Sequence, residues 1–139
     1  MSWNEIEHGL YLGNLDAAQD ESVLTLLNIT HVLTINVLPL KQFIKSDLKT
    51  KCMFIPANDT ADSDLLSWFN DTNLFIKEGR EKGACFVHCF MGISRSATVV
   101  IAYLMNQYQL CYEEAYHMVK EKRNCIIIPN YLQVVLTPY

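Results

Sequence analysis

The sequence predicts a single α/β domain with a central, mainly parallel twisted sheet flanked by helices. Apolar segments of strand length, such as 31–37, 52–56 and 84–87, alternate with longer segments whose apolar residues recur at helical spacing. The 139 residues are 50% hydrophobic and 19% charged, a composition that supports one buried core. We therefore expect one catalytic or binding domain over residues 1–139, without linkers or internal repeats.

The first part of the chain predicts a strand, a turn and one helix. Residues 7–14 contain two glycines and predict a short strand that ends in a turn. Residues 16–27 predict a helix with Asp16 at its N-cap. The residues of this helix expected to face inward are Val23, Leu24, Leu26 and Leu27.

Two strands and a longer helix are expected next. Residues 31–37 are rich in β-branched side chains, and residues 52–56 form an apolar run that ends in a proline, so both predict strands. The lysine-containing segment 39–51 between them predicts a surface connection. A helix is expected over about 63–80. The residues that should face the core from this helix are Leu65, Trp68, Phe69, Thr72 and Ile76.

The second half predicts a buried strand over 84–87 and a helix over 95–107. This helix is apolar almost all round, so it should lie at the centre of the core. Residues 112–119 carry one apolar stripe and predict another helix. Residues 131–136 fit either a helix or a strand, and Pro129 favours a helix that starts just after it.

The loop His88–Ser96, between the buried strand and the buried helix, carries the chemistry. Backbone N–H groups of a loop that opens a helix converge on one small space, and the helix dipole adds positive potential there. Such a cradle suits a phosphate-sized anion, and Arg95 can clamp two of its oxygens. The same field favours the thiolate of Cys89 near neutral pH, and a thiolate beneath a bound phosphate can attack phosphorus. The residues expected to contact the phosphate are Phe90, Met91, Gly92, Ile93, Ser94 and Arg95.

The spacing His-Cys-x5-Arg-Ser in this loop resembles the signature of the cysteine-dependent protein tyrosine phosphatases. The flanking segments Leu10–Gly13 and 55–60 resemble the dual-specificity branch, small atypical type. This resemblance implies hydrolysis of phosphotyrosine and of phosphoserine or phosphothreonine through a phosphocysteine intermediate. It also implies a shallow pocket, because nothing resembles the phosphotyrosine-recognition loop of the larger tyrosine-specific enzymes. A buried structural cysteine beside a capping arginine would leave the glycine and arginine spacing unexplained.

The resemblance also implies roles for residues outside the loop centre. Asp59 is expected to be the general acid, and Asp62 is the alternative, although it also suits a helix cap. The hydroxyl of Ser94 is expected to bond the thiolate and ease its departure, or to cap the following helix. The residues expected to support the phosphate loop are His88, Ser96 and Asn130.

Composition limits the partners. The net charge of −4 and the lack of a large basic cluster argue against nucleic acid, and no segment has the ~20 apolar residues of a membrane span. The start lacks a signal segment, so the cytoplasm, and also the nucleus, are the expected compartments. No cofactor or metal is implied, because a thiolate and an acid suffice. The expected partners are phosphorylated proteins, and the sequence leaves the oligomeric state open.

The other cysteines are Cys52, Cys85, Cys111 and Cys125, and they are expected to be small core residues. Their spacing does not fit a zinc site. A reactive thiolate is oxidised selectively, so one of them could form a reversible disulfide with Cys89. Cys52 is the candidate that we favour for this pairing.

The loop also bears on the substrate. Phe90, Met91 and Ile93 are apolar, whereas members of the superfamily that act on lipid phosphates place basic residues there. This favours a singly phosphorylated protein side chain over a phosphoinositide or capped RNA. The alternatives are a catalytically weak module that binds phosphoproteins, a tyrosine-only phosphatase, and a sulfurtransferase or arsenate reductase. The presence of Cys89, Arg95 and Asp59 together argues for turnover.

Overall fold

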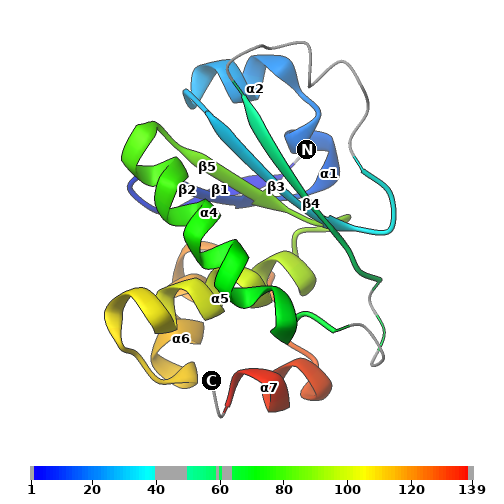
Figure 1. Ribbon diagram of the computed structural model, residues 1–139, viewed down its shortest axis with the longest axis vertical. Helices are drawn as coiled ribbons and strands as arrows, with labels where there is room; N and C mark the ends of the chain where they lie inside the picture. Colours follow the sequence, from blue (N-terminus) through cyan, green and yellow to red (C-terminus); the bar gives the residue numbers. More distant parts are fainter. Residues whose placement is uncertain (1, 40–49, 59, 61–63, 138–139) are drawn as a thin grey trace.

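One mixed sheet organises the computed structural model, which describes residues 2–39, 50–58, 60 and 64–137 (Figure 1). The strands in the described residues are β1 (Trp3–Glu7), β2 (Leu10–Gly13), β3 (His31–Asn36), β4 (Lys51–Pro56) and β5 (Cys85–His88). Their order is β1-β2-β5-β3-β4. The pair β1–β2 is antiparallel, and the other neighbours are parallel. The expected α/β fold with a mainly parallel sheet is confirmed.

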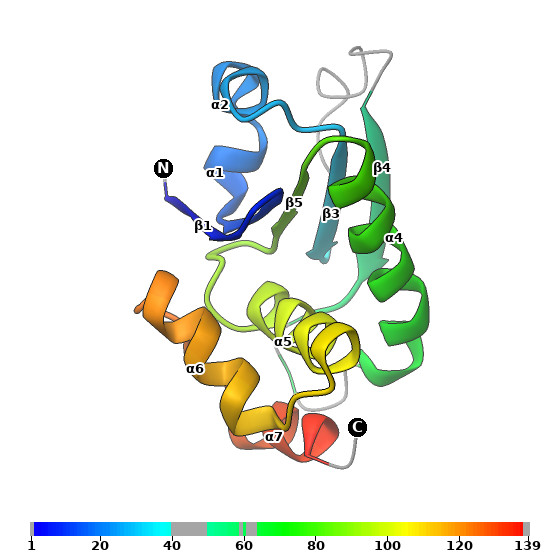
Figure 2. The same cartoon turned by 90° about the vertical axis from the view of Figure 1, so that its left-hand side faces the viewer.

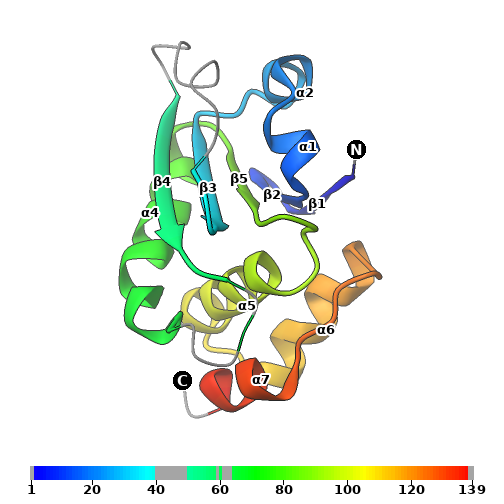
Figure 3. The same ribbon diagram turned by 90° about the vertical axis from the view of Figure 1, so that its right-hand side faces the viewer.

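Helices cover both faces of this sheet. They are α1 (Leu15–Ala18), α2 (Glu21–Leu26), the 3-10 turn η1 (Leu66–Trp68), α4 (Phe69–Lys82), α5 (Arg95–Tyr108), α6 (Tyr112–Lys122) and α7 (Asn130–Leu136). Figure 2 shows α1 and α2 on one face and α4 on the other. Figure 3 shows α6 and α7 beyond α5. No helix among the described residues has the length and apolarity that crossing a bilayer would require.

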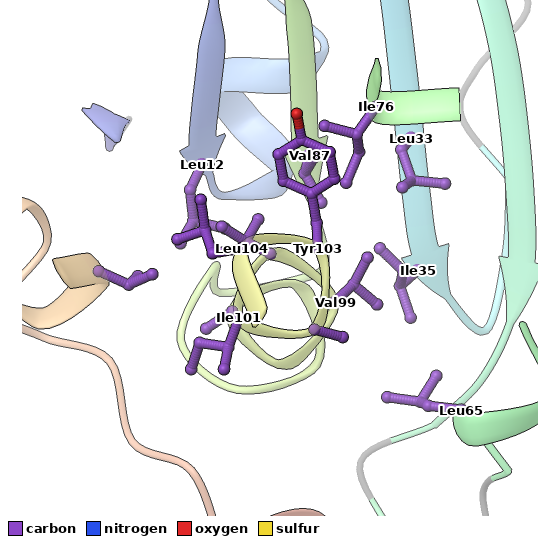
Figure 4. Packing of buried hydrophobic residues seen from close by; sticks show 14 of the residues in the cluster. Leu12, Leu33, Ile35, Leu65, Ile76, Val87, Val99, Ile101, Tyr103 and Leu104 are labelled. Carbon is purple, nitrogen blue, oxygen red and sulfur yellow. The ribbon is translucent and has the colours of Figure 1, made fainter. Parts of the chain in front are cut away.

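The alternation of side chains along the strands divides the core between the two faces. Val32 and Phe86 belong to the smaller cluster with α1 and α2, whereas Leu33 and Val87 belong to the main cluster with α4 and α5. Side chains of α5 are buried without interruption from Arg95 to Met105, as the sequence predicted. Figure 4 shows side chains of the sheet meeting those of α5. The central helix therefore fixes the loop that precedes it.

The first 30 residues differ from the prediction. The segment 7–14, expected to be one short strand and a turn, contains β2 and a turn in which Gly9 has φ +77°; β1, which pairs with β2 in a hairpin, lies almost entirely before this segment and was not predicted. The single helix expected over 16–27 is two short helices, because Asp20 accepts hydrogen bonds from the backbone N–H groups of Ser22 and Val23 and starts a second helix. The first is capped by Asn14 rather than Asp16. Leu26, expected to face inward, is 76% exposed.

The predictions for the remaining elements were closer. The strands over 31–37 and 52–56 are present as β3 and β4. The long helix is α4, which starts at Phe69 after the turn η1, later than expected. The segment 131–136 is helical, as Pro129 indicated. Residues 40–49 of the predicted surface connection lie outside the described residues.

The predictions for the cysteines were largely wrong. Only Cys85 is a core residue among those four, and the other three are exposed because they lie on the edge strand β4, before α6 and in the connection to α7. Cys52 pairs with Val32, which pairs with Phe86, so β3 separates Cys52 from the strand that leads to Cys89. Two strand spacings are roughly 10 Å, beyond the ~7 Å Cα separation that a disulfide bridges. A Cys52–Cys89 disulfide would require the sheet to open.

Candidate active site

The phosphate loop, Cys89–Ser94, leaves the carboxyl end of β5 and leads directly into α5. Because β5 lies between β2 and β3, the loop sits at the middle of the sheet edge, where ligand sites of parallel sheets form. The sequence placed Cys89 at such an edge. The neighbouring strands end there too, at Gly13 and Asn36, and both residues contribute to the surroundings of the loop.

Every carbonyl oxygen of the phosphate loop accepts a hydrogen bond from a group outside it. The donors, in chain order of the acceptors from Cys89 to Ser94, are His88 Nδ1 (3.2 Å), Leu15 N (3.0 Å), Arg123 Nη2 (3.3 Å), Arg123 Nε (2.8 Å), Ile127 N (3.0 Å) and Thr98 N and Oγ1 (both 2.8 Å). A trans peptide directs its N–H opposite to its C=O. The N–H groups of residues 90–95 are therefore turned to the opposite side, into the space that Cys89 borders.

Gly92 permits this arrangement. Its φ is +70°, a conformation that residues with a side chain rarely adopt. A Cβ atom at this position would collide with the backbone of Gly13 and lie 2.9 Å from Arg123 Nη2. Its N–H donates to the sulfur of Cys89 over 3.3 Å, which shows directly that this peptide faces the thiol.

Cys89 is buried, with 2% of its surface exposed, and its sulfur lies 3.1 Å from the hydroxyl oxygen of Ser96. Ser96 lies in the first turn of α5 and is fully buried. Ser94 occupies the N-cap position of α5, and its side chain makes no capping hydrogen bond. The sequence assigned the hydroxyl beside the thiol to Ser94 and a supporting role to Ser96. The structure places the hydroxyl of Ser96 at the sulfur, because Ser96 is on the turn that faces back to the start of the loop.

Arg95 is 8% exposed and lies at the other side of the loop. Its Nη1 donates to the carbonyl of Ala57 over 2.8 Å and to Asn36 Oδ1 over 3.3 Å. Its Nε is buried and bonds no group of the described residues, among which it also has no carboxylate partner. A buried cation with an unused donor is costly, so this position favours an anion. The sequence did not identify Asn36.

His88 is fully buried beneath the loop. Burial lowers its pKa to about 4, so the ring is neutral near pH 7. The carbonyl of Cys89 can only accept, so Nδ1, at 3.2 Å, carries the proton, and Nε2 accepts from the hydroxyl of Thr34 at 2.8 Å. His88 thus holds the first carbonyl of the loop, consistent with the support expected of it. Thr34 was not identified from sequence.

The support from the C-terminal part differs from the prediction. Asn130 is exposed in the first turn of α7, and no hydrogen bond joins its side chain to the phosphate loop within the described part of the chain. The loop is held from this side by the backbone of Ile127 and by Arg123. Arg123 was not identified from the sequence, because it follows two lysines at the end of a helix, where charged residues are usually exposed to solvent. Only burial distinguishes it.

Asp59 and Asp62, the candidate acids, lie outside the described residues. The chain just before them is attached to the site. The carbonyl of Ala57 accepts a hydrogen bond from Arg95, and the N–H of Ala57 donates to the carbonyl of Asn36 over 3.1 Å. Ala57 and Asn58 border a cleft of about 450 Å³. The other residues that line this cleft are Val37, Pro56, Asp64, Ser67 and Trp68.

Comparisons with known proteins agree with this geometry. The chain is 39% identical over 133 residues to Dual specificity protein phosphatase MPK-4 of Drosophila melanogaster, covering 94% of this chain and 34% of that protein. It is 37% identical over 125 residues to Dual specificity protein phosphatase 22 of Homo sapiens, covering 88% of this chain and 65% of that protein. The chain thus spans less than two thirds of either relative.

A solved structure of DUSP15 superimposes with a TM-score of 0.88 and 31% identity, over 98% of this chain and 85% of that one. Residues 10–137 match the family described as dual specificity phosphatase, catalytic domain. That match includes the phosphate loop, its supporting helices and the segment that contains Asp59. The chain therefore belongs to the dual specificity phosphatase family.

Proposed function

We propose that residues 1–139 act as a catalytic domain that hydrolyses phosphotyrosine and phosphoserine or phosphothreonine in proteins. One observation carries the proposal. All carbonyls of the phosphate loop are turned outward beside a buried guanidinium that has an unused Nε donor. A preorganised set of N–H donors around a thiol binds a phosphoryl group and its transition state.

The proposed reaction combines Cys89, Arg95 and Ser96 of the described site with Asp59, the acid that the resemblance implies. The Cys89 thiolate attacks phosphorus, the P–O bond to the substrate breaks, and the leaving oxygen takes a proton from Asp59. Water then attacks the phosphocysteine while Asp59 accepts a proton, and the S–P bond breaks to release inorganic phosphate. The hydroxyl of Ser96, 3.1 Å from the sulfur, stabilises the departing thiolate. Arg95 holds the phosphoryl oxygens in both steps.

The rim of the site favours a singly phosphorylated side chain. Phe90 and Met91 are 55% and 56% exposed, so the loop presents apolar surface where a second phosphate would need a basic residue. Peptide residues beside the phosphorylated one can lie against this rim. Three exposed cysteines without disulfides suit the reducing cytoplasm or nucleus, where such substrates occur.

The test is phosphate release from peptides that carry phosphotyrosine, phosphothreonine or both. We expect release from both residue types, loss of release in Cys89→Ser, and wild-type release in the control Cys111→Ser, which changes an exposed cysteine. Asp59→Ala should slow turnover by about 10²–10⁴-fold with little change in binding. The rate should pass through a maximum as the pH is varied, since Cys89 must be deprotonated and Asp59 protonated at the same time.

Each other result points elsewhere. Release from phosphotyrosine alone would leave a tyrosine phosphatase. Tight peptide binding without release would make the chain a phosphoprotein-binding module. Unchanged turnover in Asp59→Ala would mean that another group is the acid, with Asp62 the next residue to test.

A further inference from the structure

We propose that Arg123 is a positioning residue that holds the phosphate loop in its anion-binding shape, an inference that rests on the proposed function of this loop. Arg123 lies at the C-cap of α6, outside the loop in sequence, and only 2% of its surface is exposed. Its role would be to fix the direction of the N–H groups at Gly92 and Ile93 without touching the substrate.

The contacts of Arg123 join three separate parts of the chain. Nε donates to the carbonyl of Gly92 over 2.8 Å, and Nη2 donates to that of Met91 over 3.3 Å. Nη1 donates to Ser2 Oγ over 2.8 Å and to Asn4 Oδ1 over 2.9 Å. The guanidinium is thus tied to the N-terminal strand on one edge and to two successive loop carbonyls on the other.

Two successive carbonyls determine two peptide planes. With the oxygens of Met91 and Gly92 bound to Arg123, the following N–H groups, of Gly92 and Ile93, point away from it and into the phosphate space. The bond from Gly92 N to the Cys89 sulfur is one result. Because Gly92 can rotate more freely than other residues, these planes depend on an external anchor. A planar fork reaches both oxygens, whereas a lysine ammonium would have to choose between them.

The charge of Arg123 is also available to the loop. Its acceptors are two carbonyls, a hydroxyl and an amide, and it pairs with no carboxylate in the described parts of the chain. Arg80 provides the contrast, because it also ties a helix to β1 but pairs with Glu7 at 3.2 Å. Arg80 further bonds the carbonyl of His8 and the hydroxyls of Tyr103 and Tyr108, far from the loop in the fold.

The test compares Arg123→Lys and Arg123→Met with Arg80→Lys and Arg80→Met as matched controls. Two quantities are measured: the affinity for inorganic phosphate, by calorimetry, and kcat/KM on a phosphopeptide, with kcat and KM determined separately. We expect both Arg123 variants to lose about 10–100-fold in phosphate affinity and in kcat/KM, mainly through kcat. The Arg80 variants should lower the melting temperature and leave both quantities within about twofold of wild type.

A second variant guards against simple unfolding. Ser2→Ala with Asn4→Ala keeps the guanidinium but frees it from β1, and this change should weaken phosphate binding by a smaller factor in a protein that stays folded. Arg123→Met with wild-type phosphate affinity and kcat would overturn the proposal. Full rescue by Arg123→Lys would overturn it as well, because charge rather than the fork would then be sufficient.

Failure of the proposed function gives a different pattern. If the wild type hydrolyses no phosphopeptide but its phosphate affinity still falls in the Arg123 variants, the function is wrong and the positioning role stands. If the wild type is active and the Arg123 variants equal it, the function stands and the positioning role is wrong.

Discussion

The two ends of the parallel strands differ in whether their positively charged side chains pair with carboxylates. Among the described residues 2–39, 50–58, 60 and 64–137, every ion pair lies at the amino end of the strands, which is called the paired end below. These are His31–Glu78 (2.6 Å), Lys51–Glu78 (3.3 Å), Lys82–Glu78 (3.9 Å) and Arg80–Glu7 (3.2 Å). At the carboxyl end, Arg95 and Arg123 are buried and bond only neutral oxygens among those residues.

This difference separates charges that serve the fold from charges that serve the site. At the amino end each positive group, the buried His31 included, pairs with a partly exposed carboxylate, and such solvent-screened pairs contribute little and cost little. Two buried guanidinium groups without a carboxylate are destabilising on their own. A bound oxyanion at the phosphate loop would offset that cost, so the carboxyl end is arranged for a ligand that the fold does not supply.

The largest expected effect comes from exchanging the same residue at the two ends. Arg95→Lys removes the fork that reaches Ala57 and presents Nε to the site, so kcat/KM should fall by about 10²–10³-fold. Arg80→Lys, at the paired end, should change kcat/KM by less than about twofold and act on thermal stability instead. Steady-state kinetics and melting curves of both variants decide this. Equal kinetic losses would remove the distinction between the two ends.

A smaller effect is expected from the hydroxyl at the sulfur. Ser96→Ala deletes the hydroxyl that lies 3.1 Å from the Cys89 sulfur, and a hydrogen bond to a charged group contributes about 1.5–3 kcal/mol. Departure of the thiolate should therefore slow by about 10–100-fold, and phosphocysteine should accumulate as a burst before the steady state. Ser94→Ala should slow the reaction by a smaller factor without a burst. The reverse order would return the role to Ser94, as the sequence suggested.

The sequence predicted the phosphate loop, at the carboxyl ends of the parallel strands, well because its signals are local. The strand 84–87, the loop with Cys89 and Arg95, and the buried helix are contiguous, so periodicity and spacing define them together. Gly92 shows the same advantage, since its positive φ is a property of the loop itself. The position of Cys89 at a strand end followed from the rule for parallel sheets.

The supports of the loop escaped prediction because they depend on long-range contacts. Arg123, Thr34 and Asn36 are ordinary polar residues in sequence and acquire their roles only when distant elements meet at the loop. The choice between Ser94 and Ser96 depended on the direction of one helical turn, which spacing alone does not define. At the N-terminus, a local capping bond by Asp20 overrode an apolar pattern that suited one longer helix.

The smallest expected effect concerns the neutral histidine beneath the loop. Burial lowers the pKa of His88 from 6.5 to about 4, so between these values the unfolded chain binds a proton that the folded chain does not. Stability from this residue is therefore complete above pH 6.5 and falls as the pH drops toward 4, by at most about 3 kcal/mol. Carboxylates at the paired end behave differently. Hydrogen bonds, first from His31, hold the pKa of Glu78 below 4.5, so its contribution is lost only under more acidic conditions.

Urea unfolding at pH 7.5, 6.5 and 5.5 tests this separation of the two ends. The wild type should lose about 1 kcal/mol between pH 6.5 and 5.5 from His88. His88→Gln should be less stable at pH 7.5, because Thr34 and the Cys89 carbonyl lose their hydrogen bonds to the imidazole ring. Its stability should change less than that of the wild type between pH 6.5 and 5.5. An undiminished slope in His88→Gln would mean that another group is the acid-sensitive one.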